Sequence, residues 1–128
     1  MGRLVKTFIT ISLLFLITGC LNKTWTYDLP NNYKLECKNN VDTKIINNKD
    51  KILDKYIAEF QYSNNYIGLK CVEEETLAVI FYIIDTKNND IYGPYKDEET
   101  YNLVKLRITD NEEFNEFITT IEKPKQAY

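Results

Sequence analysis

Short apolar or alternating runs, separated by asparagine-rich turns, are the feature that most limits how this chain can fold. Residues 33–38 alternate apolar and charged side chains, which is the period of a half-buried strand. The apolar side of that strand would carry Tyr33, Leu35 and Cys37. Asparagine pairs at 39–40 and 47–48 flank a short apolar run at 43–46, which predicts a turn, a strand and a turn.

The segment 50–62 carries conflicting signals, because some of its apolar residues have helical spacing while others alternate. The alternation favours a strand that ends at Tyr62. Residues 63–65 then predict a turn, since asparagine tolerates positive φ, and residues 66–72 supply a returning strand.

Residues 77–84 are the most hydrophobic run outside the amino-terminal region, and they are rich in β-branched and aromatic types. Their length and composition favour a central strand buried on both faces. The chain is expected to turn over 85–90, return at 91–92 and leave the hairpin at Gly93-Pro94.

Two helices are predicted toward the carboxyl end. Asp97 can cap a helix over 98–107, and the two glutamates that follow it suit a positive helix N-terminus. Asp110 and Glu113 resemble a capping box ahead of an apolar stripe over 114–121, with a proline to end that helix.

The predicted fold class is therefore α+β. It consists of a small antiparallel sheet of about five strands with one or two C-terminal helices on one face. A chain of 128 residues has room for one domain, which is expected to span 33–122, with a tail at 123–128.

The amino-terminal residues have the layout of a secretory signal. Arg3 and Lys6 precede an apolar run over 7–19. A helix of a dozen residues reaches roughly 18 Å, short of the ~30 Å hydrocarbon thickness of a bilayer. A cleaved export signal is therefore preferred to a permanent transmembrane anchor.

Ile17, Thr18, Gly19 and Cys20 end this run, and they resemble the lipobox of bacterial lipoproteins. The resemblance implies that Cys20 receives a diacylglyceryl group through a thioether and that a signal peptidase removes residues 1–19. Two acyl chains anchor a protein stably, so we expect it on the extracytoplasmic face of the cell membrane. The alternative is an ordinary signal peptide with a coincidental cysteine.

After that cleavage, residues 20–32 would form the lipidated N-terminus and a short polar tether. The remaining chain has 14 basic and 19 acidic side chains, a net charge of −5. A net acidic chain without basic clusters argues against nucleic acid as a partner. The abundance of Asn, Lys and Ile, with only two Arg, suggests a Gram-positive bacterium with an AT-rich genome.

Cys37 and Cys71 are the remaining thiols, and both fall on the apolar side of a predicted strand. A disulfide between them is possible in an exported protein. The alternative is two buried thiols that act as small hydrophobic side chains.

Histidine is absent, which removes Ser-His and Cys-His nucleophile pairs and every zinc site that uses histidine. No other catalytic constellation replaces them, so we predict a non-enzymatic protein with no catalytic residue, no cofactor and no metal site. Three weaker alternatives remain, and one of them is a glycosidase that uses a pair of carboxylates. Acidic groups at 73–75, at Asp85 with Asp90, and at 97–99 could bind Ca²⁺, and the ten tyrosines could stack on sugars.

Residues 25–35, 66–67 and 82–94, followed by Glu98-Glu99, together resemble a domain-of-unknown-function family of short lipoproteins from bacilli and clostridia. The similarity spans most of residues 20–109. Its motifs are hairpin and turn signatures, so the resemblance implies a fold and a location and transfers no catalytic residue.

We therefore expect a lipid-anchored envelope protein whose domain presents an interaction surface to another envelope protein. A sheet edge or the turns at 64–65 and 88–89 would form that surface. The alternative is a module that binds cell-wall glycan or cations.

Substitution of Cys20 by alanine tests the lipid assignment. The wild-type protein should incorporate a radioactive fatty acid, and Cys20→Ala should incorporate none, because the thiol is the acceptor of the thioether. Label that persists on Cys20→Ala would show the assignment to be wrong.

Overall fold

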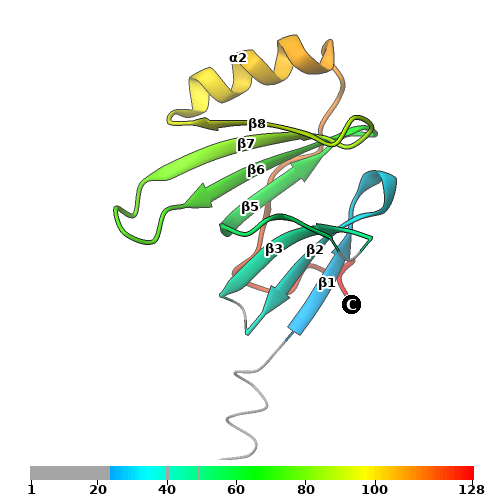
Figure 1. The fold of residues 1–128 in the computed structure, drawn as a ribbon, viewed down its shortest axis with the longest axis vertical. Coiled ribbons are helices and arrows are strands. Elements are labelled where there is room, and N and C mark those ends of the chain that lie inside the picture. Colours follow the sequence, from blue (N-terminus) through cyan, green and yellow to red (C-terminus); the bar gives the residue numbers. More distant parts are fainter. Residues whose placement is uncertain (1–23, 40, 49) are drawn as a thin grey trace, which may run out of the picture.

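A computed structural model describes residues 24–128, apart from residues 40 and 49. Over these residues the chain forms two antiparallel sheets and a helix, arranged as three layers with one sheet in the middle (Figure 1). The first sheet contains β1 (Thr24–Asp28), β2 (Tyr33–Lys38), β3 (Asp42–Asn47) and β4 (Asp50–Leu53). The second contains β5 (Tyr56–Tyr62), β6 (Tyr66–Val72), β7 (Val79–Asp85), β8 (Asp90–Tyr95) and β9 (Ile118–Thr119). A short 3-10 helix, η1 (Pro30–Asn32), follows β1, and the α-helix is α2 (Glu98–Thr109).

The first sheet is a meander in the order β1-β2-β3-β4. The alternation in β2 is confirmed, because Tyr33, Leu35 and Cys37 are buried and the residues between them are not. In register with β2, β1 places Trp25 opposite Cys37 and Tyr27 opposite Leu35. All five side chains therefore lie on the inner face of this sheet.

The second sheet has the order β8-β7-β6-β5-β9, and its inner face packs against the first sheet. The prediction of a central strand is confirmed, since β7 lies between β6 and β8. Ile80, Tyr82 and Ile84 of β7 face the core between the sheets, whereas Phe81 and Ile83 face the helix.

The expected end of the hairpin at Gly93-Pro94 is wrong, because β8 continues to Tyr95. A shift of register between β7 and β8 lets the strand pass the proline, which has no N–H to donate. Gly93 adopts a φ of 124°, in a region that side-chain-bearing residues rarely occupy.

The helix predicted after Asp97 is confirmed. The Asp97 side chain accepts a hydrogen bond of 2.7 Å from the backbone N–H of Thr100. Tyr101 is fully buried, its ring stacks on Phe81 at 4.9 Å between centroids, and its hydroxyl donates to Gln61 at 2.6 Å. Tyr101 therefore fixes the helix on the outer face of the second sheet.

The second predicted helix, over 110–121, is absent from the structure. Asp110 has a left-handed φ of 52° and closes α2 instead of opening a helix. Phe117 packs against Tyr101, and Ile118 pairs with Phe60 as part of β9. The apolar residues at helical spacing thus contact two different elements, and these tertiary contacts override the helical pattern.

The predicted tail at 123–128 also proves to be part of the fold. Residues 118–128, which we call the carboxyl-terminal strap, run from the edge of the second sheet to the edge of the first (Figure 1). Thr120 donates to the carbonyls of Ile57 and Ala58, at 2.5 Å and 3.0 Å. Tyr128 exchanges two backbone hydrogen bonds with Thr26, of 2.6 Å and 2.9 Å.

The tether predicted over 20–32 is likewise too long, because β1 and η1 lie inside it. Trp25 and Tyr27 are only 1% and 2% exposed, so this segment belongs to the core. The folded region therefore begins by Thr24 and continues through the strap. The coarse prediction of an antiparallel sheet with a helix is confirmed, but the fold is mainly β, and the single predicted sheet is one of two.

A double-mutant cycle tests the contact that holds α2. A Cβ on Gly68 would overlap the Tyr101 hydroxyl, so Gly68→Ala should lower the free energy of unfolding by about 2 kcal/mol in urea denaturation. Tyr101→Phe should cost about 1 kcal/mol through the lost hydrogen bond to Gln61.

The double variant should lose less than the sum of the two single losses, since the clashing hydroxyl is gone. Strict additivity would contradict the packing described here.

Candidate functional site

Four turns rich in asparagine lie together at one end of the two sheets. They connect β1 to β2 through η1, β3 to β4, β5 to β6, and β7 to β8. We call this region the asparagine-rich end. Its amide side chains belong to Asn31, Asn32, Asn47, Asn48, Asn64, Asn65, Asn88 and Asn89.

Hydrogen bonds between turns hold this end together. The Asn31 amide donates to the Thr86 hydroxyl at 2.7 Å, and that hydroxyl donates to the Asn65 carbonyl at 2.7 Å. The Tyr33 hydroxyl donates to the Asn89 side chain. Turns from the two sheets are thus tied to each other, so the asparagine-rich end is one surface of fixed shape.

Asparagine occurs at these turns because several of them need a left-handed backbone. Asn31, Asn32, Asn48 and Asn89 have φ values of 56°, 68°, 51° and 58°. Asparagine adopts this conformation more readily than other side-chain-bearing residues, because its short polar side chain can bond locally. The turns predicted from the sequence at 47–48 and over 85–90 are confirmed, whereas the positive φ expected in the turn at 63–65 is not found there.

Two hollows open at the asparagine-rich end. The larger, of about 850 Å³, lies between the η1 turn and β3 and is lined by Asp28, Leu29, Asn31, Asn32, Tyr33, Lys34, Ile46 and Asn48. The smaller, of about 460 Å³, lies beside the β5–β6 turn and is lined by Asp28, Pro30, Asn31, Tyr62, Ser63, Asn64 and Glu113. Asp28 and Asn31 line both hollows, which therefore form neighbouring parts of one surface.

Two buried polar atoms at this end lack a hydrogen-bond partner among the residues described. They are the hydroxyl oxygen of Ser63, a residue that is 6% exposed, and the side-chain oxygen of Asn47. A buried polar atom without a partner is costly, and a bound group that supplied the missing hydrogen bond would remove that cost. Ser63 also lines the smaller hollow, so one of these two buried groups lies directly beside it.

Burial keeps the tyrosine hydroxyls at this end protonated. Desolvation raises the pKa of Tyr33 above its ordinary value, with a further contribution from the Asp85 carboxylate. Desolvation also raises the pKa of Tyr27, and its hydrogen bond to Tyr62 adds to the effect. These phenols therefore remain neutral hydrogen-bonding groups and cannot act as bases near neutral pH.

The acidic groups weighed as calcium ligands serve the turns and the helix. The Asp85 carboxylate accepts hydrogen bonds from the backbone of Lys87 and Asn88 and from the Asn88 amide, at 2.9–3.2 Å. Asp97 caps α2, and Glu73 accepts from Thr76 within its own loop. Over the described part of the chain, no three potential metal-ligating side chains gather at one point.

The tyrosines are also placed differently from a sugar-binding platform. Tyr27, Tyr33, Tyr82 and Tyr101 are buried in the cores on either side of the second sheet. Tyr128 is 58% exposed, but its hydroxyl donates to Asp28 within the strap contact. Tyr66, Tyr92 and Tyr95 are partly buried, and they pack against the cluster beneath the helix.

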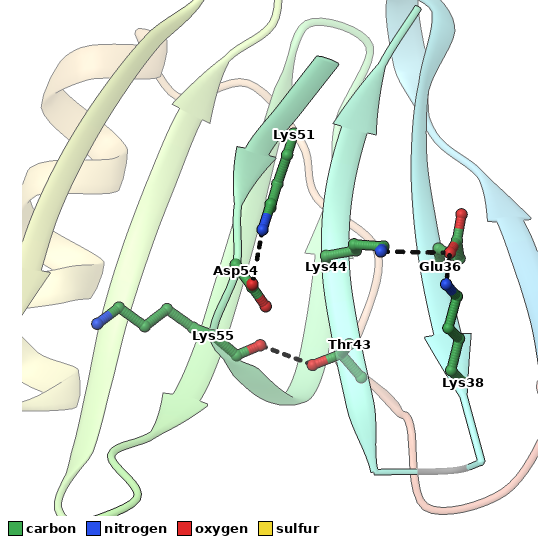
Figure 2. A network of polar contacts seen from close by, with 7 residues as sticks. All are labelled: Glu36, Lys38, Thr43, Lys44, Lys51, Asp54 and Lys55. Atoms are coloured by element: carbon green, nitrogen blue, oxygen red, sulfur yellow. Dashed lines mark hydrogen bonds and ion pairs between the residues drawn. The ribbon is translucent and has the colours of Figure 1, made fainter. Parts of the chain in front are cut away.

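Charged residues on the outer face of the first sheet pair with each other (Figure 2). Glu36 lies 3.6 Å from both Lys38 and Lys44, and Lys51 lies 3.0 Å from Asp54. Such solvent-exposed pairs contribute little free energy and leave no unpaired charge cluster to attract a ligand. We therefore place the candidate site at the asparagine-rich end and not on this face.

The two cysteines proposed as a disulfide lie on different sheets. Cys37 lies on β2 of the first sheet and Cys71 on β6 of the second, and both are completely buried in the core between the sheets. Cys71 is a thiol in the structure. Burial raises the pKa of Cys71 to about 12, which makes it unreactive.

The predicted lipobox lies in a part of the chain that the structure does not describe. Ile17, Thr18, Gly19 and Cys20 lie outside the described residues. Between Thr24 and Tyr128, no described helix combines the length and the apolar character needed to cross a bilayer. Comparisons with protein-family models, curated proteins and solved structures returned no match.

The turns at 64–65 and 88–89 had been singled out from the sequence, and both lie at the asparagine-rich end. The contributions of η1 and of the β3–β4 turn were missed. The sequence signal for these two turns was the pair of asparagines that each contains, as do the turns at 64–65 and 88–89. Such pairs indicate that a turn is present, but they do not indicate that the four turns lie together.

Alkylation tests the state of the two inner thiols. In the folded protein, iodoacetamide near pH 8 should not modify Cys71, because its raised pKa leaves almost no thiolate. In denaturant without reductant, mass spectrometry should find one adduct on Cys37 and one on Cys71. Adducts that appear only after reduction would show that a disulfide joins them.

Proposed function

We propose that this chain is a lipid-anchored protein of the bacterial envelope, held on the extracytoplasmic face by Cys20, whose asparagine-rich end binds another envelope protein. The observation that carries the proposal is the position of that end. It lies at the opposite end of β1 from Thr24, the residue at which the chain enters the domain.

The length of chain between anchor and domain supports this orientation. Thr24 is only four positions after Cys20, and four residues reach roughly 14 Å when fully extended. The start of β1 must therefore stay close to a lipid attached at Cys20. The asparagine-rich end then points away from the membrane, where a partner can reach it.

The chemistry of the surface favours a protein partner. Amide groups and neutral hydroxyls offer many donors and acceptors of hydrogen bonds. The two adjacent hollows make the surface concave, so that side chains of a partner can enter it. Donor and acceptor groups that intramolecular contacts already hold in place lose little conformational entropy when they bind a partner.

The domain is proposed to act without catalysis. Its buried tyrosines are held neutral, and the described carboxylates at Asp85 and Asp97 are engaged in turn and cap contacts.

Site-specific photocrosslinking in intact cells tests the proposal. A photoreactive phenylalanine analogue at Asn64 should crosslink to one protein, because this residue lines the smaller hollow. The same analogue at Lys44, on the outer face of the first sheet, is the matched control and should not give that product. Identical products from both positions, or none from Asn64, would contradict the proposed surface.

Retention on purified cell wall separates the alternative. A glycan-binding module would be retained by wall free of protein, and retention would be lost when Asn64 is replaced by a bulky residue. The proposal expects no such retention.

A further inference from the structure

The end of the domain nearest Thr24 carries exposed apolar side chains. Leu77, in the loop between β6 and β7, is 74% exposed and is the most exposed large hydrophobic residue in the described part of the chain. Val41, in the turn between β2 and β3, is 63% exposed, and Val79, at the start of β7, is 39% exposed. We call these three residues the anchor-side patch.

Strand pairing places this patch at the same end as the start of β1. Thr24 pairs with Lys38, the last residue of β2, directly before the turn that contains Val41. In the second sheet, Val72 pairs with Val79 at the base of the loop that contains Leu77. Figure 1 shows the β6–β7 loop at the left of the molecule, with the β2–β3 turn and the start of β1 below it and further to the right.

A direct contact couples the two sheets at this end. The Thr43 hydroxyl donates to the Lys55 carbonyl at 2.7 Å (Figure 2). The same hydroxyl accepts from the backbone N–H of Ile57 at 2.6 Å. The first residues of β3 are thereby fixed against the first residues of β5. The β6–β7 loop and the β2–β3 turn, which carry the anchor-side patch, are therefore held at fixed positions relative to each other.

The loop around Leu77 presents its side chain in a defined way. Leu77 adopts a left-handed φ of 57°, a conformation that is unfavourable for leucine and in which asparagine or glycine is commoner. Two backbone hydrogen bonds of 2.9 Å close the loop, from Glu73 to Ala78 and from Leu77 to Glu73. A leucine with a strained backbone and an exposed side chain contributes little to folding, so its side chain is available for a contact outside the domain.

We infer that the anchor-side patch rests on the outer leaflet of the membrane, with Leu77 and Val41 inserted at the headgroup boundary. This inference depends on the proposed lipid anchor at Cys20, which lies four positions before Thr24 and brings this end to the bilayer. Because the anchor supplies a high effective concentration of lipid, even a few apolar side chains suffice for a lasting contact.

The charges at this end indicate an apolar contact and not an electrostatic one. Glu73, Glu74 and Glu75 lie in the same loop as Leu77, while Lys38 and Lys55 lie at the neighbouring turns. These charges of opposite sign give no net attraction to anionic headgroups. Zwitterionic vesicles should therefore be sufficient to show the contact.

Quenching by brominated lipid tests the inference on the full lipidated protein. We would reconstitute Leu77→Trp and Asn64→Trp in vesicles of brominated phosphatidylcholine, with the wild-type protein as reference for the buried Trp25. The tryptophan at position 77 should lose about half of its added emission, because bromine quenches on contact near the acyl boundary. The tryptophan at position 64, at the opposite end, should lose none.

Vesicle flotation separates this inference from the proposed function. Protein that floats with vesicles while both tryptophans remain unquenched would overturn the membrane contact and leave the anchor intact. Protein that does not float would overturn the anchor and this inference together.

A second variant excludes a purely structural role for Leu77. Leu77→Asn suits the left-handed backbone, so the urea midpoint should stay the same or rise. In a Val41→Trp background it should reduce quenching by brominated lipid. A fall in the urea midpoint with unchanged quenching would overturn the inference.

Discussion

The packing of the two inner sheet faces is the interaction on which the rest of this structure depends. Trp25, Leu35 and Ile45 of the first sheet form one continuous core with Phe60 and Leu69 of the second. A four-stranded meander buries only one face, so it needs a second sheet to remove that face from water. The second sheet is covered on both sides, which explains the unbroken apolar sequence of β7.

The carboxyl-terminal strap and the inter-turn hydrogen bonds make this packing specific. Thr120 binds the edge of the second sheet, and Tyr128 binds β1 of the first, so one segment joins both edges. At the far end, Asn31 and Asn89 link turns of one sheet to residues of the other. Edge strands that are covered in this way are also protected from pairing with other chains.

Local patterns predicted the elements that depend on local chemistry. The alternation at 33–38, the apolar run at 77–84 and the cap at Asp97 correspond to β2, β7 and α2. The elements that were missed depend on contacts far along the chain. Apolar residues over 114–121 have helical spacing, but Phe117 and Ile118 pack on α2 and β5, which no local pattern reveals.

The candidate surface was predictable only in part, for the same reason. Paired asparagines predicted turns, yet their convergence follows from how the two sheets pack. Strand β1 was not predicted from the sequence, because only Trp25 and Tyr27 alternate with polar residues there. Two apolar positions are too few to give a clear strand pattern.

The roles proposed for the two ends of the domain both depend on the short chain between Cys20 and Thr24. The proposed anchor at Cys20 would hold the start of β1 near the lipid and leave the opposite end free. In that orientation the exposed leucine would face the apolar boundary of the bilayer, and the hydrogen-bonding turns would face water. One orientation of the domain on the membrane would therefore account for both the proposed membrane contact and the proposed partner surface.

Hydrogen–deuterium exchange tests this orientation most directly. The lipidated protein on vesicles would be compared with the unlipidated Cys20→Ala protein in solution. The account predicts slower exchange on vesicles for residues 73–79 and 41–42, and unchanged exchange for residues 63–65 and 86–89. Slower exchange at the asparagine-rich end, or no difference at either end, would contradict it.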